Sequence, residues 1–252
     1  MNPPVNALSR ELAGALREAW QSVDAKRIVL TGSGKMFVAG ADIREIERIT
    51  RGELPPDLNY LNELLGMIEQ SGKLVVMAMN GGALGIGLEL AMAGHYRILN
   101  EAAKVGLPEV KLGLIPGAGG TQRLPRLAGA EATLEMCVGG EAISATRALE
   151  LGIVDEVCVG NVVERALLIE AGRRTDQMNC APYGEWERWR QVAVQGERAP
   201  LRAIQAIRAA TEAESFEAGL AREAELFVEA LCDVEARAKV ERFFAERQSR
   251  KG

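Results

Sequence analysis

The hydrophobic positions in the first two thirds of the chain switch repeatedly between the spacing of strands and that of helices. Short apolar runs bounded by glycine or polar residues predict strands, and apolar residues three or four apart predict helices with one buried face. Strands are expected at residues 27–31, 74–79, 96–99, 104–107 and 154–159. Helices are expected at residues 6–23, 41–49, 58–68, 84–92, 121–127, 130–138 and 145–151. This interleaving indicates an α/β core.

The strand expected at 74–79 has no polar face, which distinguishes it from a half-buried strand. Its sequence, Leu-Val-Val-Met-Ala-Met, predicts that both sides are covered. The apolar stretch 74–94 has Glu89 as its only formal charge, but Asn80 and five glycines interrupt it. We therefore interpret this stretch as a buried core segment rather than a membrane span.

The pattern becomes nearly all helical after residue 161. Residues 215–247 are rich in Ala, Glu, Leu and Arg and have a hydrophobic period near that of a helix. The expected organisation is a core over residues 1–195 followed by a helical subregion over residues 196–252.

Composition excludes several kinds of active site. The 252 residues carry a net charge of -5, and 48% are hydrophobic, as in an ordinary globular chain. The single histidine, His95, excludes a two-histidine zinc site within the chain and leaves one candidate base for a Ser-His-Asp triad. The four cysteines form no Cys-x-x-Cys pair, which predicts free thiols in a reducing cytoplasm. The acidic balance argues against nucleic acid as a partner.

The glycine-rich turns do not match the common nucleotide-binding motifs. Gly-x-Gly occurs at 32/34, 85/87 and 117/119, but the sixth position of a dinucleotide fingerprint is Phe37, Leu90 or Gln122. The two Gly-Lys pairs, at 34/35 and 72/73, are followed by Met and Leu rather than Ser or Thr, so the P-loop motif fails too. These glycines therefore serve close packing or expose backbone amides.

Glu89 is the one charge on a predicted helix that is otherwise apolar on every face. Such a helix is buried, and a buried carboxylate is costly unless it has partners. One interpretation is a structural glutamate that accepts hydrogen bonds. The other is an active-site carboxylate, because perturbed carboxylates cluster at functional sites.

Glu109 follows a proline at the end of a predicted strand, where active groups are often presented. Considered alone, it also fits a solvated loop residue or a helix N-cap. Together with Glu89, it is a candidate acid/base pair in which one carboxyl is protonated and the other ionised.

Carboxylates alone do not activate a carbonyl group, so such a site also needs oxyanion donors. The backbone amides at residues 40–42 lie where a helix is expected to begin, so that unpaired N–H groups and the helix dipole converge there. The glycine-rich start of the Glu89 helix, residues 85–87, offers a second donor.

Three long motifs, in order, resemble the crotonase, or enoyl-CoA hydratase/isomerase, superfamily. They are Ala-Gly-Ala-Asp-Ile at 39–43, Asn-Gly-Gly-Ala-Leu-Gly-Ile-Gly-Leu-Glu-Leu at 80–90, and the segment 106–124 from Gly-Leu-Pro-Glu to Thr-Gln-Arg-Leu. Within the superfamily, residues 94–98, 105–109 and 243–247 are most similar to the hydratase/isomerase part of bifunctional fatty-acid β-oxidation enzymes.

The resemblance implies a fold and a set of site residues. The fold is a ClpP-like spiral of ββα units with a helical C-terminal subregion. By motif position, the backbone amides of Ala41 and Ile86 form the oxyanion hole, and Glu89 and Glu109 are catalytic. Ile86 stands where the family usually has glycine. The candidate substrate or CoA contacts are Ala39, Asp42, Ile43, Arg44 and Gly117. By the resemblance, Gly117 aligns with a backbone amide near the catalytic water. Arg44 is either a contact for CoA phosphates or a solvated surface arginine.

The implied activity is syn addition of water across the 2,3 double bond of a 2-enoyl-CoA. The same sites allow Δ3-Δ2 isomerisation, in which Glu109 alone shuttles a proton. No metal and no cofactor are expected, because coenzyme A is part of the substrate. The alternatives are an acyl-CoA-binding paralogue without activity, and another crotonase-fold reaction at the same oxyanion donors. The chain length of the acyl group is not implied.

The resemblance also implies partners and missing parts. Family members often form trimers or hexamers, and bifunctional relatives carry a 3-hydroxyacyl-CoA dehydrogenase part after this one. The family's first strand normally precedes the motif at residues 2–8, so we expect that strand to be missing or the start codon to be misassigned, with an exposed sheet edge as the result. The chain is then a stand-alone paralogue, an excised domain or a truncated product.

Overall fold

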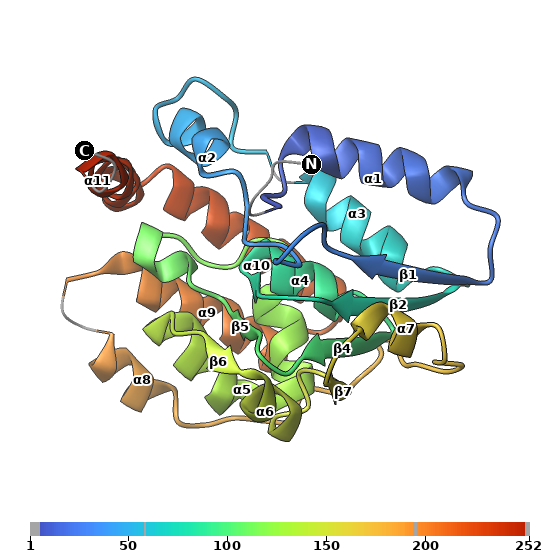
Figure 1. Ribbon diagram of the computed structural model, residues 1–252. Coiled ribbons are helices and arrows are strands. Elements are labelled where there is room, and N and C mark those ends of the chain that lie inside the picture. The colour runs from blue at the N-terminus through green and yellow to red at the C-terminus, as the bar shows by residue number, and fades with distance from the viewer. Residues whose placement is uncertain (1–5, 58, 194–195, 250–252) are drawn as a thin grey trace.

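Two small sheets and a set of surrounding helices form the structure, a computed structural model that describes residues 6–57, 59–193 and 196–249. The first sheet has the order β1-β2-β4-β7, and all its neighbouring strands are parallel. The second has the order β3-β5-β6, with β3 and β5 parallel and β5 and β6 antiparallel. The α/β class predicted from the sequence is confirmed (Figure 1).

The strands are β1 (Arg27–Thr31), β2 (Leu74–Met79), β3 (Ala83–Leu84), β4 (Tyr96–Asn100), β5 (Lys104–Gly106), β6 (Ile143–Ser144) and β7 (Glu156–Cys158). The helices are α1 (Arg10–Ser22), α2 (Ile43–Thr50), α3 (Asn59–Glu69), α4 (Ile86–Met92), α5 (Gly120–Gly139), α6 (Ala145–Glu150), α7 (Val162–Ala166), α8 (Trp186–Val192), α9 (Arg198–Glu212), α10 (Phe216–Leu231) and α11 (Val234–Ser249). A short 3-10 helix, η1, spans Glu109–Leu112.

β2 is buried on both sides, as its uniformly apolar sequence predicted. Val76 and Ala78 belong to a small hydrophobic cluster that includes residues of α7, whereas Val75, Met77 and Met79 belong to the main core. The stretch 74–94 is therefore core strand and core helix. No helix in the described part of the chain is long and apolar enough to cross a membrane.

Most predicted helices form, with differences at their ends. Ser9 caps α1 by accepting the Leu12 N–H, so the helix begins later than the apolar pattern suggested. The two helices predicted at 121–127 and 130–138 are joined in α5 across a kink at Gly129, where φ is 80°. The two-residue strand β6 was not predicted, because a strand this short has no readable alternation.

The C-terminal helices pack against the α/β core. In Figure 1, α9 and α10 lie beside α5, and α11 lies near α2. The contacts between α9 and α5 are extensive, and α11 touches both α2 and η1. The boundary proposed between residues 195 and 196 stays a prediction. Helices from the end of the chain therefore cover α2, η1 and α5, which come from earlier parts of the sequence.

β1 lies at an edge of the first sheet, where it pairs with β2 alone among the described residues. Its middle residues are half-buried and its two ends are exposed. The expectation of an open sheet edge agrees with this arrangement, and the expectation of a missing first strand stays a prediction.

Candidate active site

A cavity of about 470 Å³ lies between α2, the start of α4, η1, the loop before α5 and helix α10. Most of its lining is apolar, as expected for a small-molecule site with a few polar groups that fix orientation. The lining includes Ala39, Gly40, Ala41, Asp42, Ile43, Gly85, Ile86, Glu89, Glu109, Leu114, Ile115, Gly117, Ala118 and Phe227. Both predicted carboxylates and both predicted oxyanion positions therefore share one cavity.

The two candidate oxyanion positions are brought together by two chain segments that run side by side. Val38 and Ala83 form a parallel bridge, and the Leu84 N–H donates to the Val38 carbonyl at 3.0 Å. Two residues further on, a Cβ placed on Gly85 would lie 3.9 Å from the Cα of Gly40. The next residue in each segment, Ala41 and Ile86, lines the same cavity.

The N–H groups of Ala41 and Ile86 are both free to bind a ligand. Ala41 precedes α2, and Ile86 is the first residue of α4. Within the part of the chain that the structure describes, neither amide has a backbone or side-chain acceptor. Gly85 turns the chain with φ at 55°, a conformation that favours glycine and that orients the Ile86 amide at the helix start.

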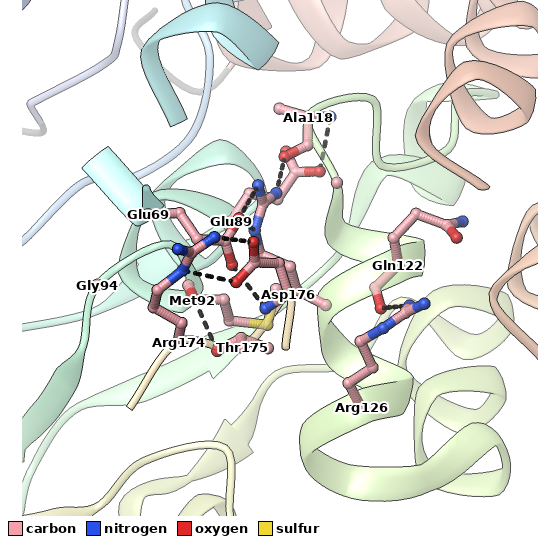
Figure 2. Close-up of polar contacts among 12 residues, drawn as sticks. Glu69, Glu89, Met92, Gly94, Ala118, Gln122, Arg126, Arg174, Thr175 and Asp176 are labelled. Carbon is pink, nitrogen blue, oxygen red and sulfur yellow. Dashed lines mark hydrogen bonds and ion pairs between the residues drawn. The ribbon is translucent and has the colours of Figure 1, made fainter. Parts of the chain in front are cut away.

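Glu89 is buried on α4 and is held by backbone amides. Its Oε1 accepts the N–H groups of Ala118 and Gly120, both at 2.8 Å. Figure 2 shows Glu89 beside Ala118. Only 2% of the residue is exposed. Burial raises the pKa of Glu89, while these two amides and the nearby Arg123 guanidinium oppose that rise. Both hydrogen bonds use one oxygen, so they leave Oε2 for other partners.

Glu109 begins η1 and places its carboxyl group beside Gly85. A Cβ on Gly85 would lie 2.8 Å from Glu109 Oε1, so any side chain there would collide with the carboxyl group. Glu109 Oε2 is buried and has no hydrogen-bond partner in the described residues. Burial raises the pKa of Glu109 well above its ordinary value, and the Glu89 and Glu223 charges raise it further. The interpretation of Glu109 as a solvated loop residue is wrong.

Glu223, on α10, is a third buried carboxylate that sequence reasoning did not identify. It is fully buried and accepts the Gly119 and Thr121 N–H groups and the Thr121 hydroxyl. Burial, followed by the Glu89 charge, raises its pKa to about 8. It lies on the buried stripe of α10 with Gly219, Leu226 and Ala230, and a glutamate at that helical spacing was the available signal.

The predicted substrate-contact residues divide into two groups. Ala39, Ile43 and Gly117 line the cavity. Asp42 also lines it, but its carboxylate caps α2 through the Arg44 N–H and pairs with the Arg44 side chain. Arg44 is exposed and is not among the residues that line the cavity. The structure thus brings four of these five together and leaves Arg44 at the surface.

A buried ion pair supports the loop that holds Glu89, and the sequence analysis did not find it. Arg123 pairs with Glu69 at 2.7 Å, and each side chain is 1% exposed. The Arg123 guanidinium also donates to the Ala118 carbonyl at 2.9 Å, on the same residue whose N–H binds Glu89. Glu69 accepts the Asp176 N–H as well, in the polar group that Figure 2 shows around Glu69 and Glu89.

His95 is packed rather than placed at the cavity. One ring nitrogen accepts the Val75 N–H at 3.1 Å, and the other lies 2.9 Å from the Glu69 carbonyl. It is 6% exposed and does not line the cavity. Its role in the described structure is to fill the core next to β2.

The chain is similar in sequence to a known family of proteins. The sequence model of a family described as "Enoyl-CoA hydratase/isomerase" matches residues 1–180. A peroxisomal bifunctional enzyme of Danio rerio is 41% identical over 269 residues, covering 99% of this chain and 36% of that protein. A probable enoyl-CoA hydratase of Bacillus subtilis is 44% identical over 183 residues, covering 68% of this chain and 69% of that protein. The chain belongs to the enoyl-CoA hydratase/isomerase family.

Solved structures confirm the fold. An enoyl-CoA hydratase/isomerase from Mycobacterium paratuberculosis aligns with a TM-score of 0.70 at 22% identity, covering 96% of this chain and 92% of that one. A Pseudomonas aeruginosa protein titled DspI aligns with a TM-score of 0.58 at 29% identity, covering 97% and 88%. The crotonase fold expected from the three motifs is therefore confirmed. The chain spans about a third of the length of the bifunctional relatives it matches.

Proposed function

We propose that this chain is an enoyl-CoA hydratase that adds water syn across the 2,3 double bond of a 2-enoyl-CoA in fatty-acid β-oxidation. The observation that carries the proposal is the meeting of two unpaired amides and two buried carboxylates in one cavity. Family membership supports it, as do relatives whose names include probable enoyl-CoA hydratase and a multifunctional protein of fatty-acid β-oxidation.

The proposed mechanism begins with the thioester carbonyl between the Ala41 and Ile86 amides. These donors stabilise the negative charge that develops on that oxygen as water adds to the conjugated double bond. The donors are fixed in a partly enclosed cavity, so little reorganisation is needed when the charge forms.

The two glutamates take opposite protonation states in this mechanism. Glu89 has two amide donors that favour its ionised form, and it removes a proton from the water that attacks C3. Glu109 has an unpartnered buried oxygen and two carboxylate neighbours, which favour its protonated form, and it donates a proton to C2. Proton transfer by Glu109 between C2 and C4 would give the isomerase reaction.

The test is turnover of purified protein with crotonyl-CoA and longer 2-enoyl-CoA substrates. Hydration removes the conjugated thioester, so the absorbance of the substrate falls as the product forms. Calorimetric binding of CoA thioesters with no turnover at any chain length would instead support a binding paralogue without activity.

The oxyanion role of Ile86 gives a separate prediction. Ile86→Pro removes one amide donor at the first position of α4, where proline is tolerated in a helix. We expect kcat/KM for crotonyl-CoA to fall by about 10²- to 10³-fold, as expected for loss of one oxyanion donor. Ile86→Val keeps the N–H and is the matched control. Equal activity of the folded proline variant and the control would exclude Ile86 from the oxyanion hole.

The proposed partners of the chain extend beyond this site. The acyl-CoA thioester is the proposed substrate, and the product, a 3-hydroxyacyl-CoA, would pass to a dehydrogenase supplied by a fused part or a separate protein. A trimer or hexamer stays a prediction. The proposed compartment is a reducing cytoplasm, whereas the names of several relatives place those proteins in peroxisomes or glyoxysomes.

A further inference from the structure

Four successive backbone amides at the start of α5 are shared alternately between two carboxylates from different helices. Glu89 of α4 accepts the amides of Ala118 and Gly120. Glu223 of α10 accepts the amides of Gly119 and Thr121, at 2.5 and 2.8 Å. The loop is therefore clamped from two sides, and the geometry of one set of bonds fixes that of the other.

We propose that Glu223 is a positioning residue for Glu89: it holds the 118–121 loop so that the Ala118 and Gly120 amides fix the Glu89 carboxylate at the cavity. Glu223 does not itself line the cavity, so it acts through the loop rather than on the substrate. The catalytic part of this inference rests on the proposed hydratase function, whereas the structural part does not.

The position of Glu223 suits this role because its surroundings are closely packed. Its side chain is fully buried, and α10 packs against both α5 and α9. Gly119 has φ at 90°, and a Cβ there would lie 1.8 Å from an Arg123 nitrogen, so the loop has little room to move. Thr121 adds a hydroxyl donor to the same Glu223 oxygen that accepts its amide. A displacement of about 1 Å near reacting groups costs about 10²-fold in rate.

The charged and titratable groups near Glu223 determine the expected pH dependence. They are Glu89 on α4, Glu109 on η1, and Arg123 and Cys137 on α5. On the other neighbouring helices, several charged side chains are paired elsewhere: Arg202 with Asp233, Arg208 with Glu212, and Lys239 with Glu235. The ionised form of Glu223 raises the pKa of Glu109, so removal of that charge lets Glu109 lose its proton at lower pH.

The first test measures the loop without turnover. In Glu223→Gln, the amide nitrogen that replaces one carboxylate oxygen cannot accept a backbone N–H. We expect amide hydrogen exchange, followed by NMR, to accelerate at least tenfold at Ala118 and Gly120 as well as at Gly119 and Thr121. Acceleration confined to Gly119 and Thr121 would overturn the proposal, because Glu223 would then hold only its own partners. This result is independent of whether the chain is a hydratase.

The second test measures catalysis of crotonyl-CoA hydration over a range of pH. For Glu223→Gln we expect kcat to fall about 10- to 100-fold, with KM changed far less, and the alkaline limb of kcat to move to lower pH. Asp233→Asn is the matched control, because it also removes a buried carboxylate that accepts hydrogen bonds, just after α10 and outside the cavity. It should leave both kcat and the pH limb unchanged. An equal loss of kcat at every pH in Glu223→Gln would indicate a merely structural role and overturn the proposal.

Glu223→Asp keeps the charge but draws the carboxylate back by one methylene group. We expect this variant to lower kcat while the alkaline limb stays where it is in the wild type. A kcat equal to that of the wild type would overturn the positioning role, and this variant serves the same purpose if the glutamine variant does not fold. If the wild type shows no turnover while Glu223→Gln accelerates exchange as expected, the result would contradict the hydratase proposal alone.

Discussion

Glu109→Gln is expected to lower kcat for hydration of crotonyl-CoA by about 10²- to 10⁴-fold, the range for loss of a positioned general acid or base. Glutamine fills the same space beside Gly85 but cannot donate an acidic proton to C2. The expectation follows from the position of Glu109 in the cavity lining and from its Oε2, which has no hydrogen-bond partner among the described residues. Initial rates from the loss of conjugated-thioester absorbance provide the measurement.

The same range of loss is expected for Glu89→Gln, because the proposed mechanism needs both groups. Glu141→Gln is the matched control, since this carboxylate is exposed and pairs only with Lys111 at the surface. We expect it to keep wild-type kcat within about twofold. If a folded Glu109→Gln or Glu89→Gln protein turned over like the control, that glutamate would not be catalytic.

The second large effect is on stability. Arg123→Met is expected to reduce the free energy of unfolding by about 3–5 kcal/mol, because Glu69 would remain buried without its charged partner. The same change removes the donor to the Ala118 carbonyl and so loosens the loop that binds Glu89. Urea unfolding followed by circular dichroism measures the loss.

Two further variants separate this cause from simple loss of packing. The double variant Glu69→Gln with Arg123→Met removes both charges and should recover part of the stability that the single change loses. Arg44→Met breaks an exposed ion pair and should leave the free energy of unfolding close to that of the wild type. A loss for Arg123→Met as small as that for Arg44→Met would show that the buried pair is not a major contributor to stability.

Glu89 was predictable from the sequence because its helix is apolar on every other face, so a single charge there required partners. The unpaired amides of Ala41 and Ile86 were also predictable, because both lie where glycine-rich turns lead into helices. Glu109 was ambiguous from its own neighbours, and only its place in a motif favoured the active site. Its burial beside Gly85 depends on how two distant segments pack, which periodicity does not report.

The groups that support the site were missed for a common physical reason. Glu69, Arg123 and Glu223 sit in helices that carry other charged residues, and each is distinguished only by the face on which it lies. Salt-bridged or hydrogen-bonded partners from distant segments make their burial tolerable, and those partners are set by tertiary packing. The contact of α10 with α5, which brings Glu223 to the loop, was likewise not evident from either helix alone.

The most direct test of the central claim is incubation of the purified wild-type chain with a panel of 2-enoyl-CoA thioesters of increasing length. We expect the conjugated-thioester absorbance to fall for at least one chain length, with the 3-hydroxyacyl-CoA as product and with the rate abolished or strongly reduced in Glu109→Gln. Binding of these thioesters by calorimetry, with no loss of absorbance at any chain length, would contradict the proposal that this cavity is a hydratase active site.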